Sequence, residues 1–398
     1  MASLHLLSPR GFTASGVAAG IKLSGKVDVG LLTCASPVTA AAVFTTNRVF
    51  AAPIKVGRAH IAGGKLQAIV VNSGNANACT GKRGYGDAVT MCRLAADALG
   101  CAPTAILPSS TGIIGHLLPM KKIRTGIAAA ALGLGNSRQH ATDFMDAILT
   151  TDLKRKSAAV EFKIGRETVR LAGVCKGSGM IGPRMATMLA YLTTDVAAAA
   201  PLLRKLLSEA ADESFNCVTV DDHASTNDTA VLLASGQSGG RLDSSSAAKK
   251  FAAALREVTQ SLAWQIAADG EGATKVVKIV VTGASSMPAA KAIARAMANS
   301  PLVKCAMHGN DPNWGRLVSA AGYAGVPFDP DKAALKLQGT VVFRNGTPME
   351  FDSAKVSAAL KASEVTAELN CGGGMGHATV WTCDLSKEYV TINADYHT

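Results

Sequence analysis

Hydrophobic and polar positions in the first half of the chain alternate between segments typical of buried strands and segments with helical spacing. Residues 66–71 (LQAIVV) are an unbroken apolar run of the kind that forms a buried strand, and a loop rich in asparagine and glycine follows it. Helical spacing occurs over 87–99 and again near 141–149. Between these helices lies SSTGIIG, residues 109–115, which we interpret as a loop after a short strand.

The second half continues the same alternation. The apolar run 185–192 predicts a strand, and Pro201 opens a helix whose leucines share one face. A second helix carries apolar residues at 251, 255, 258 and 262. This helix is expected to stop at Asp269 and Gly270, which places Glu271 in the turn before the strand KVVKIVVTG.

Strands and helices that alternate to the end of the chain predict a layered α/β (α+β) protein. The length of 398 residues suits two domains or one large body. The serine- and alanine-rich segment 241–250 (RLDSSSAAKK) is expected to be a surface loop and not a linker between domains.

The charge balance is basic, with 40 lysines and arginines against 29 acidic residues and a net charge of +11. These charges are scattered, and aromatic residues, 5% of the chain, are not interleaved with them as a nucleic-acid surface would require. An anionic small substrate attracted by the excess charge explains the balance at least as well. We therefore expect no nucleic-acid partner.

Cysteine usage indicates a reducing compartment. The nine cysteines are an odd number and include no Cys-x-x-Cys pair or zinc spacing, so we expect no metal site. Cys175 and Cys305 lie in apolar runs and are interpreted as core residues. The N-terminus is too short and too polar for a signal peptide, and no membrane-length apolar run occurs. We expect a soluble cytoplasmic protein with no membrane partner.

Two groups of residues invite a functional interpretation that their spacing does not support. KGSGMIG, residues 176–182, has its lysine before the glycines and matches neither a phosphate-binding loop nor a serine nucleophile elbow. His223 lies among carboxylates in VDDHASTND, which would suit a metal or a base only if the loop folded back on itself. A turn whose side chains bond their own backbone is the favoured interpretation.

The glycine run leads into Thr187, which could act as a nucleophile without a histidine. If the bond before Thr187 is cut, its freed α-amino group, with a reference pKa of about 7.7–8.0, can serve as the base. A flexible Gly-Ser-Gly loop would let the preceding carbonyl twist toward the threonine hydroxyl for an N-to-O acyl shift. On composition alone, a buried threonine at a loop-to-strand junction is the commoner alternative.

Several segments together resemble the ArgJ family, the glutamate N-acetyltransferases also called ornithine acetyltransferases. KGSGMIGPRMATML resembles the self-processing segment of that family. Other segments resemble family segments in the family's order: NSGNANACTG, SSTGIIG, ILTTD, STNDT, DGEGATK, DPNWGR and INADY. Because they span nearly the whole chain, chance similarity is a poor explanation.

The resemblance implies a layered αββα fold of the DmpA/ArgJ type, cut between Ala186 and Thr187 into an alpha chain, 1–186, and a beta chain, 187–398. Thr187 would take an acetyl group from N-acetylornithine as an ester and pass it to glutamate, in arginine biosynthesis. The resemblance implies no cofactor, although acetyl-CoA could be a co-substrate. The partners implied are these small molecules and a heterotetramer of two alpha and two beta chains.

Further site residues follow from the same resemblance. The Thr111 hydroxyl and the Gly112 amide would form the oxyanion hole, because two preorganised donors stabilise a tetrahedral oxyanion. A lysine fits an amino-acid carboxylate, and a glutamate fits the charged end of ornithine. The C-terminal residue would contribute only if the tail docks into the site. The residues implied to hold substrate are Thr150, Lys176, Thr187, Glu271, Asn393 and Thr398.

Two departures from the family pattern stand out. Arg184 replaces the usual asparagine before the cut, and VDDHAST, around His223, replaces a pattern closer to Asp-Gly-Asp-Thr-Ser-Thr. Both bear on rate and acyl preference more than on reaction type. The alternatives are a related self-cleaving amidase or aminopeptidase with water as acceptor, and an uncut relative that only binds.

Overall fold

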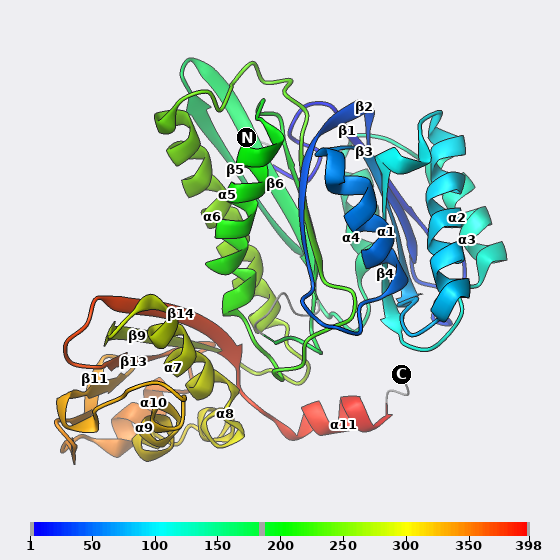
Figure 1. Cartoon of the computed structure of the whole chain (residues 1–398). Helices are drawn as coiled ribbons and strands as arrows, with labels where there is room; N and C mark the ends of the chain where they lie inside the picture. Colours follow the sequence, from blue (N-terminus) through cyan, green and yellow to red (C-terminus); the bar gives the residue numbers. More distant parts are fainter. Residues whose placement is uncertain (1–3, 183–187, 396–398) are drawn as a thin grey trace.

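Two β-sheets organise the chain (Figure 1) in a computed structural model that describes residues 4–182 and 188–395. Within these residues the larger sheet has eight strands, and β1 (Phe12–Val17) lies off its main path, paired with β2. The order along that path is β4 (Ile106–Ile113), β3 (Lys65–Asn75), β2 (Val29–Phe44), β8 (Thr229–Ala234), β7 (Leu189–Thr194), β6 (Glu167–Lys176) and β5 (Lys156–Ile164).

The long strand β2 joins two halves of this sheet. Its first part pairs with β1 and β3 and its last part pairs with β8, with a register irregularity between Thr33 and Val38. Alternate side chains of β3 point to opposite faces. Ile69 and Val71 pack in one core cluster with Tyr191 of β7, whereas Val70 packs against the helices on the other side. The two halves therefore face each other around a shared core.

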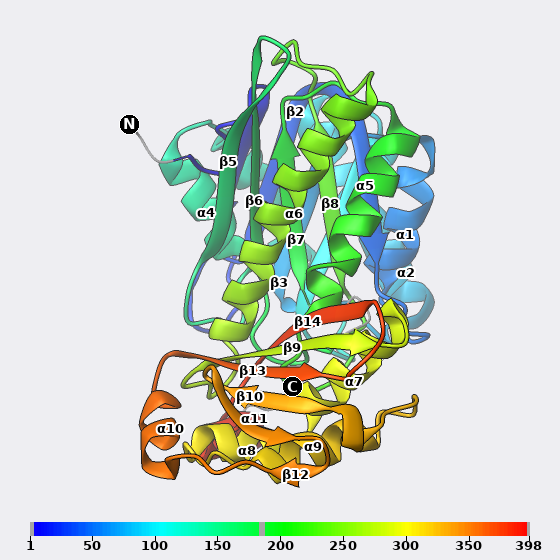
Figure 2. The same cartoon turned by 90° about the vertical axis from the view of Figure 1, so that its left-hand side faces the viewer.

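Helices cover the outer faces of both halves (Figures 1 and 2). The β2–β4 half is covered by α1 (Ala52–His60), α2 (Gly81–Leu99) and α3 (Met120–Leu132). The other half is covered by α5 (Ala200–Asp212) and α6 (Ser245–Ala268), and α4 (Arg138–Ile148) packs mainly against β1. This helix–sheet–sheet–helix order confirms the predicted layered αββα fold.

A smaller mixed sheet follows α6 and lies below the first body in Figure 1. Its order among the described residues is β12 (Thr347–Pro348), β11 (Thr340–Arg344), β10 (Ala334–Leu337), β13 (Glu364–Asn370), β9 (Val276–Ala284) and β14 (Gly376–Cys383). The helices of this part are α7 (Met287–Asn299), α8 (Pro301–His308), α9 (Trp314–Gly322) and α10 (Ser353–Ala359). Short 3₁₀ turns are η1 (Ile61–Gly63), η2 (Pro103–Ala105), η3 (Phe215–Cys217) and η4 (Pro330–Lys332).

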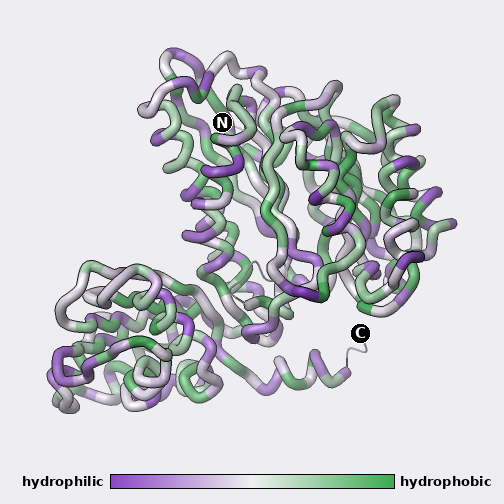
Figure 3. The backbone as a smooth tube through the Cα atoms, viewed as in Figure 1, coloured by the Kyte–Doolittle hydropathy of each residue, from purple (hydrophilic) through white to green (hydrophobic). Residues whose placement is uncertain are grey.

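The last helix, α11 (Lys387–Asp395), leaves β14 and runs back beneath the first body (Figure 1). Hydrophobic segments gather in the central strands, and many hydrophilic ones lie on the outer helices and loops (Figure 3). Among the described residues, no helix has both the length and the apolar character needed to cross a membrane.

Several predicted elements are confirmed. Residues 66–71 lie in β3, 141–148 lie in α4, and the helix with Pro201 in its first turn is α5. The helix that stops before Asp269 is α6, and Glu271 lies in the turn between α6 and β9, as expected. Of the run predicted as a strand over 185–192, β7 covers the part from Leu189, and 185–187 lie outside the described residues.

Three predictions are wrong. Residues 109–113 are strand and not loop, because β4 pairs in parallel with β3 along this stretch. From Ser245 onward RLDSSSAAKK forms the first turns of α6, because the Ser244 side chain accepts a hydrogen bond from the Ala247 amide and caps the helix. Cys175 is buried as expected, but Cys305 is exposed on α8.

Candidate active site

Every predicted site residue in the described part of the chain lines one cavity of about 110 Å³. The cavity lies where the ends of β4 and β6, the loop after α4, the loop before β8 and the turn after α6 meet α11. Ala186, Thr187 and Thr398 lie outside the described residues. The predicted residues brought together here are Thr111, Gly112, Thr150, Lys176, Glu271 and Asn393.

The Thr111–Gly112 segment is held by parallel pairing with β3. Ser73 lies opposite Thr111, and Gly74 lies opposite Gly112. Gly112 has φ +129°, and a Cβ atom there would lie 2.4 Å from the carbonyl carbon of Gly74. Only glycine therefore fits at this close approach of two backbones.

A buried polar network fixes this pair of strands. The Ser110 hydroxyl donates to Oδ1 of Asn72 at 2.6 Å. Nδ2 of Asn227 donates to the carbonyls of Ala76 at 2.7 Å and Ser110 at 2.8 Å. These bonds join the β3–β4 edge to the loop before β8, so the cavity wall that includes Thr111 is fixed by hydrogen bonds on both sides of the sheet edge.

Lys176, at the end of β6, is buried to 3% exposure at the cavity wall. No hydrogen bond or ion pair joins its Nζ to any residue that the structure describes. Burial lowers the pKa of Lys176, and the nearby carboxylates of Asp152, Asp228 and Glu271 oppose this effect. A buried cationic group without a partner is suited to bind a carboxylate.

Sequence reasoning missed a buried ion cluster behind the cavity. Nζ of Lys156 lies 2.6 Å from Oδ1 of Asp152 and 2.5 Å from Oδ2 of Asp269, and all three side chains are almost fully buried. Burial by itself would raise the pKa of Asp152. Lys156 and Lys176 outweigh this effect by stabilising the carboxylate, and they lower the pKa to about 2. Burial lowers the pKa of Lys156, but Asp152 and Asp269 outweigh it and raise the value.

This cluster positions three segments of the site. Asp152 accepts hydrogen bonds from the amides of Thr150 at 3.1 Å and Gly177 at 2.7 Å. Asp269 accepts from the amides of Leu153 and Lys154, in the loop after α4. Asp152 lies in ILTTD and Asp269 in DGEGATK, but their spacing gives no sign that they share a buried lysine.

We expected the glycine run to be flexible. Its described part, residues 176–182, is instead held in place by hydrogen bonds. The Ser178 hydroxyl donates to the Asp269 carbonyl at 2.6 Å, and the Glu271 amide donates to the Ser178 carbonyl at 3.0 Å. A Cβ atom on Gly179 would lie 2.2 Å from Oε2 of Glu271. Gly179 is therefore needed to leave room for that carboxylate.

Helix α11 closes the cavity on one side. Nδ2 of Asn393 donates to Oε2 of Glu271 at 2.9 Å, and the Tyr389 hydroxyl donates to Oδ2 of Asp221 at 3.4 Å. Burial raises the pKa of Tyr389 to about 12. The same Asp221 accepts from the His223 amide at 3.1 Å, which confirms the predicted turn, and the His223 side chain is exposed.

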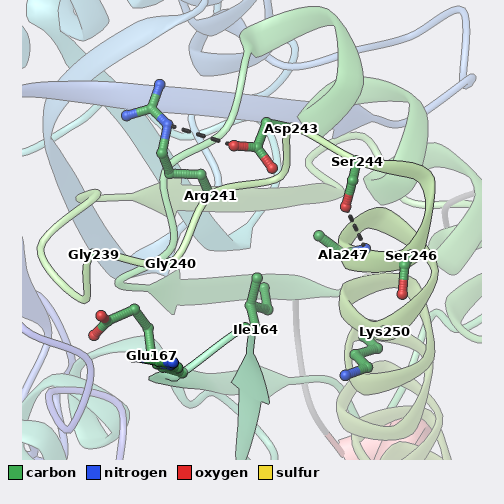
Figure 4. A pocket seen from close by; sticks show the side chains of 12 residues that line it. Ile164, Glu167, Gly239, Gly240, Arg241, Asp243, Ser244, Ser246, Ala247 and Lys250 are labelled. Carbon is green, nitrogen blue, oxygen red and sulfur yellow. Dashed lines mark hydrogen bonds and ion pairs between the residues drawn. The ribbon is translucent and has the colours of Figure 1, made fainter.

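A second cavity of about 510 Å³ lies at the opposite end of β5 and β6, beside their connecting turn (Figure 4). Its walls include Glu167 and Arg241, and Lys250 from the first turns of α6. None of the predicted site residues lines it. In the part of the chain that the structure describes, no group of three or more histidine, cysteine or acidic side chains could hold a metal ion.

The αββα fold carries a small cavity whose lining combines apolar residues with Thr111, Lys176 and Glu271, a size and chemistry suited to a small molecule. The sequence matches the ArgJ family over residues 13–398, and the chain belongs to this family. It is thus an acetyltransferase of arginine biosynthesis, as the resemblance of its motifs implied.

Related proteins share most of the chain. An arginine biosynthesis bifunctional protein ArgJ from Symbiobacterium thermophilum is 47% identical, and the match covers 98% of each chain. One from Rhodopirellula baltica is 44% identical over 99% of this chain and 97% of its own. The crystal structure of the ArgJ protein from Bacillus halodurans aligns with a TM-score of 0.51 and 37% identity, covering 52% of this chain and 98% of that one.

Proposed function

We propose that this protein transfers an acetyl group from N-acetylornithine to glutamate through an ester on Thr187. Family membership supports the proposal, and one observation carries it. The six described residues that the family motifs assign to the oxyanion hole and to the substrate come from five separate places in the sequence, yet they line one cavity. Cleavage between Ala186 and Thr187 would give chains of residues 1–186 and 187–398.

The proposed reaction has two acyl transfers. The Thr187 hydroxyl attacks the acetyl carbonyl, its proton passes to the α-amino group of Thr187, and the oxyanion is held by the Thr111 hydroxyl and the Gly112 amide. The C–N bond then breaks, and ornithine leaves with that proton. The glutamate amine attacks the ester in the same way, and N-acetylglutamate leaves while the Thr187 hydroxyl is restored.

Charges on the cavity wall suit amino-acid substrates. Lys176 would bind the α-carboxylate of either substrate, because its Nζ has no ionic partner among the described residues. Glu271 would bind the ammonium group of ornithine, with Asn393 fixing the orientation of its carboxylate. Thr150 and the tail residue Thr398 would complete the site.

The proposal extends to assembly and to the first acetyl donor. Two alpha and two beta chains would form the heterotetramer. Acetyl-CoA would acetylate Thr187 when N-acetylornithine is absent. The enzyme could then make N-acetylglutamate from a new acetyl group as well as from the acetyl group of N-acetylornithine. A labelled acetyl-CoA incubation with glutamate, followed for labelled N-acetylglutamate, tests this second donor.

Intact mass measurement after incubation with N-acetylornithine tests the main proposal. We expect two chains, with one acetyl group added to the chain that begins at Thr187. The Thr187→Ala variant is the matched control, and it should give one uncut chain of about 40.7 kDa without an adduct. One uncut chain from the unaltered sequence would overturn the proposed nucleophile.

Product analysis separates transfer from hydrolysis. With labelled N-acetylornithine, N-acetylglutamate should form only when glutamate is added. Free acetate in the absence of glutamate, with no N-acetylglutamate in its presence, would instead identify the amidase alternative.

A further inference from the structure

Asp228 is a fully buried carboxylate next to the first described residue after the proposed cut. Its Oδ1 accepts a hydrogen bond from the Met188 amide at 2.8 Å, and the Met188 carbonyl accepts one from the Thr229 amide at 3.1 Å. Its Oδ2 is buried and has no hydrogen-bond partner in residues 4–182 and 188–395. Because a buried carboxylate oxygen without a donor is costly, a further donor at Oδ2 would stabilise the folded protein.

The groups that face Asp228 come from several elements. Lys176 at the end of β6 acts on it through its charge, and Thr45 after β2 and Ser225 in the loop before β8 present hydroxyl groups. Burial raises the pKa of Asp228 well above its usual value, although the Met188 amide and these groups lower it. Burial thus favours the neutral form of Asp228, and a cation beside it would favour the ionised form.

We propose that Asp228 orients the α-amino group of Thr187 and stabilises its protonated form, an inference that rests on the proposed function. The Met188 nitrogen that Oδ1 holds is separated from the α-nitrogen of Thr187 by only three covalent bonds. One carboxylate can bind two nitrogens so placed, one with each oxygen. The unpartnered Oδ2 would receive the hydrogen bond from the α-amino group that cleavage frees.

This role completes the usual chain of nucleophile, base and orienting group. When the Thr187 hydroxyl attacks the acetyl carbon, its proton moves to the α-amino group and an ammonium ion forms. Asp228 stabilises that positive charge without taking the proton. The ammonium then returns the proton to the nitrogen of the departing ornithine, and Asp228 ends the cycle unchanged.

The test compares acetyl transfer by wild-type protein and Asp228→Asn, which removes the charge but keeps the size. Because Asp228 acts on an amine that exists only after cleavage, the variant should still be cut into two chains. We expect kcat to fall about 100-fold, as for loss of general-base assistance, with KM for N-acetylornithine nearly unchanged. The acid limb of the kcat/KM profile should move to lower pH, because removing the carboxylate lowers the pKa of the amine.

Asp195→Asn is the matched control, because Asp195 is equally buried and lies just after the opposite end of β7. Its carboxylate also accepts backbone hydrogen bonds, from the amides of Arg170 at 2.8 Å and Arg10 at 3.2 Å. This control should lower the unfolding temperature without changing kcat or the pH profile. Equal kcat and pH profiles in the two variants would overturn the inference, as would failure of a folded Asp228→Asn protein to be cut.

The wild-type protein gives a second measurement that does not depend on the variant folding. The rate at which an amine-selective reagent modifies the α-amino group of Thr187, followed by intact mass between about pH 6 and 10, gives its pKa. Contact with Asp228 predicts a value above the reference of about 8, and a value at or below the reference contradicts it. If the wild-type chain is neither cut nor acetylated, the proposed function itself has failed. This outcome is distinct from a negative result for Asp228→Asn and from a low pKa of the amine.

Discussion

Gly179 shows how one residue can shape the cavity. Its missing side chain makes room for the Glu271 carboxylate, which accepts a hydrogen bond from Asn393. A methyl group on Gly179 can be accommodated only if Glu271 swings away, because the carboxylate is the movable partner. The proposed ammonium site would then lose its geometry while the backbone stays in place.

We therefore expect Gly179→Ala to raise KM for N-acetylornithine about 10-fold, the equivalent of roughly 1.4 kcal/mol of binding. Steady-state kinetics measures this effect, and urea unfolding should show little change. Gly86→Ala is the control, because Gly86 lies on the exposed face of α2 with open space around it. It should leave KM unchanged and add up to about 1 kcal/mol of stability through helix propensity. Equal KM values for the two variants would exclude the proposed role of Gly179.

At the scale of elements, Lys156 ties the loop after α4 to the end of α6 through two buried carboxylates. In the Asp152→Asn variant, Lys156 keeps only Asp269 of its two carboxylate partners. We therefore expect a loss of about 2–3 kcal/mol in unfolding free energy at pH 7. Urea unfolding measures this loss. The surface pair of Arg170 and Glu161, at 2.8 Å, supplies the control Glu161→Gln, which should cost less than about 1 kcal/mol. An equal cost for both variants would contradict the structural role of the cluster.

The same cluster predicts how stability depends on acid. The folded pKa of Asp152 is about 2, below the usual 3.8, so its contribution is fully present above pH 3.8 and is lost as the pH falls toward 2. The unfolding free energy of the wild type should therefore drop more between pH 4 and 2 than that of Asp152→Asn. Parallel curves for the two proteins over this range would rule out the shifted carboxylate as the cause.

At the scale of the whole molecule, the proposed cut divides the larger sheet in an interleaved way. In the strand order, β8 and β7 belong to residues 187–398, but they lie between β2 and β6, which belong to residues 1–186. Neither proposed chain is therefore a separate folding domain, because each would leave sheet edges and core side chains uncovered.

We expect residues 1–186 and 187–398 to remain associated after cleavage and to separate only in denaturant. Size-exclusion chromatography of cleaved protein should give one species, and a denaturing gel should give two bands. When produced alone, each segment should lack cooperative thermal unfolding, with the uncut Thr187→Ala protein as the folded control. Cooperative unfolding of the isolated 1–186 segment would contradict the interleaved arrangement.

Local patterns predicted much of the fold and the membership of the candidate site. Apolar spacing located β3, α4, α5 and α6, because a strand or helix that packs on a core must repeat its apolar residues at its own period. Family motifs named six of the described residues that line the cavity, although their roles remain predictions. Spacing missed the part of β4 from Ser109 onward, since these polar residues are strand only through pairing with β3.

The sequence by itself therefore determined the elements, the layered class, the family and the residue types available for acyl transfer. Only the tertiary structure decided which charges are buried together and which lack a partner. Lys156 meets Asp269 across 113 positions, and Asp228 holds Met188 across 40. The physical reason is that burial and ionic pairing depend on distances in space between segments that no local period relates.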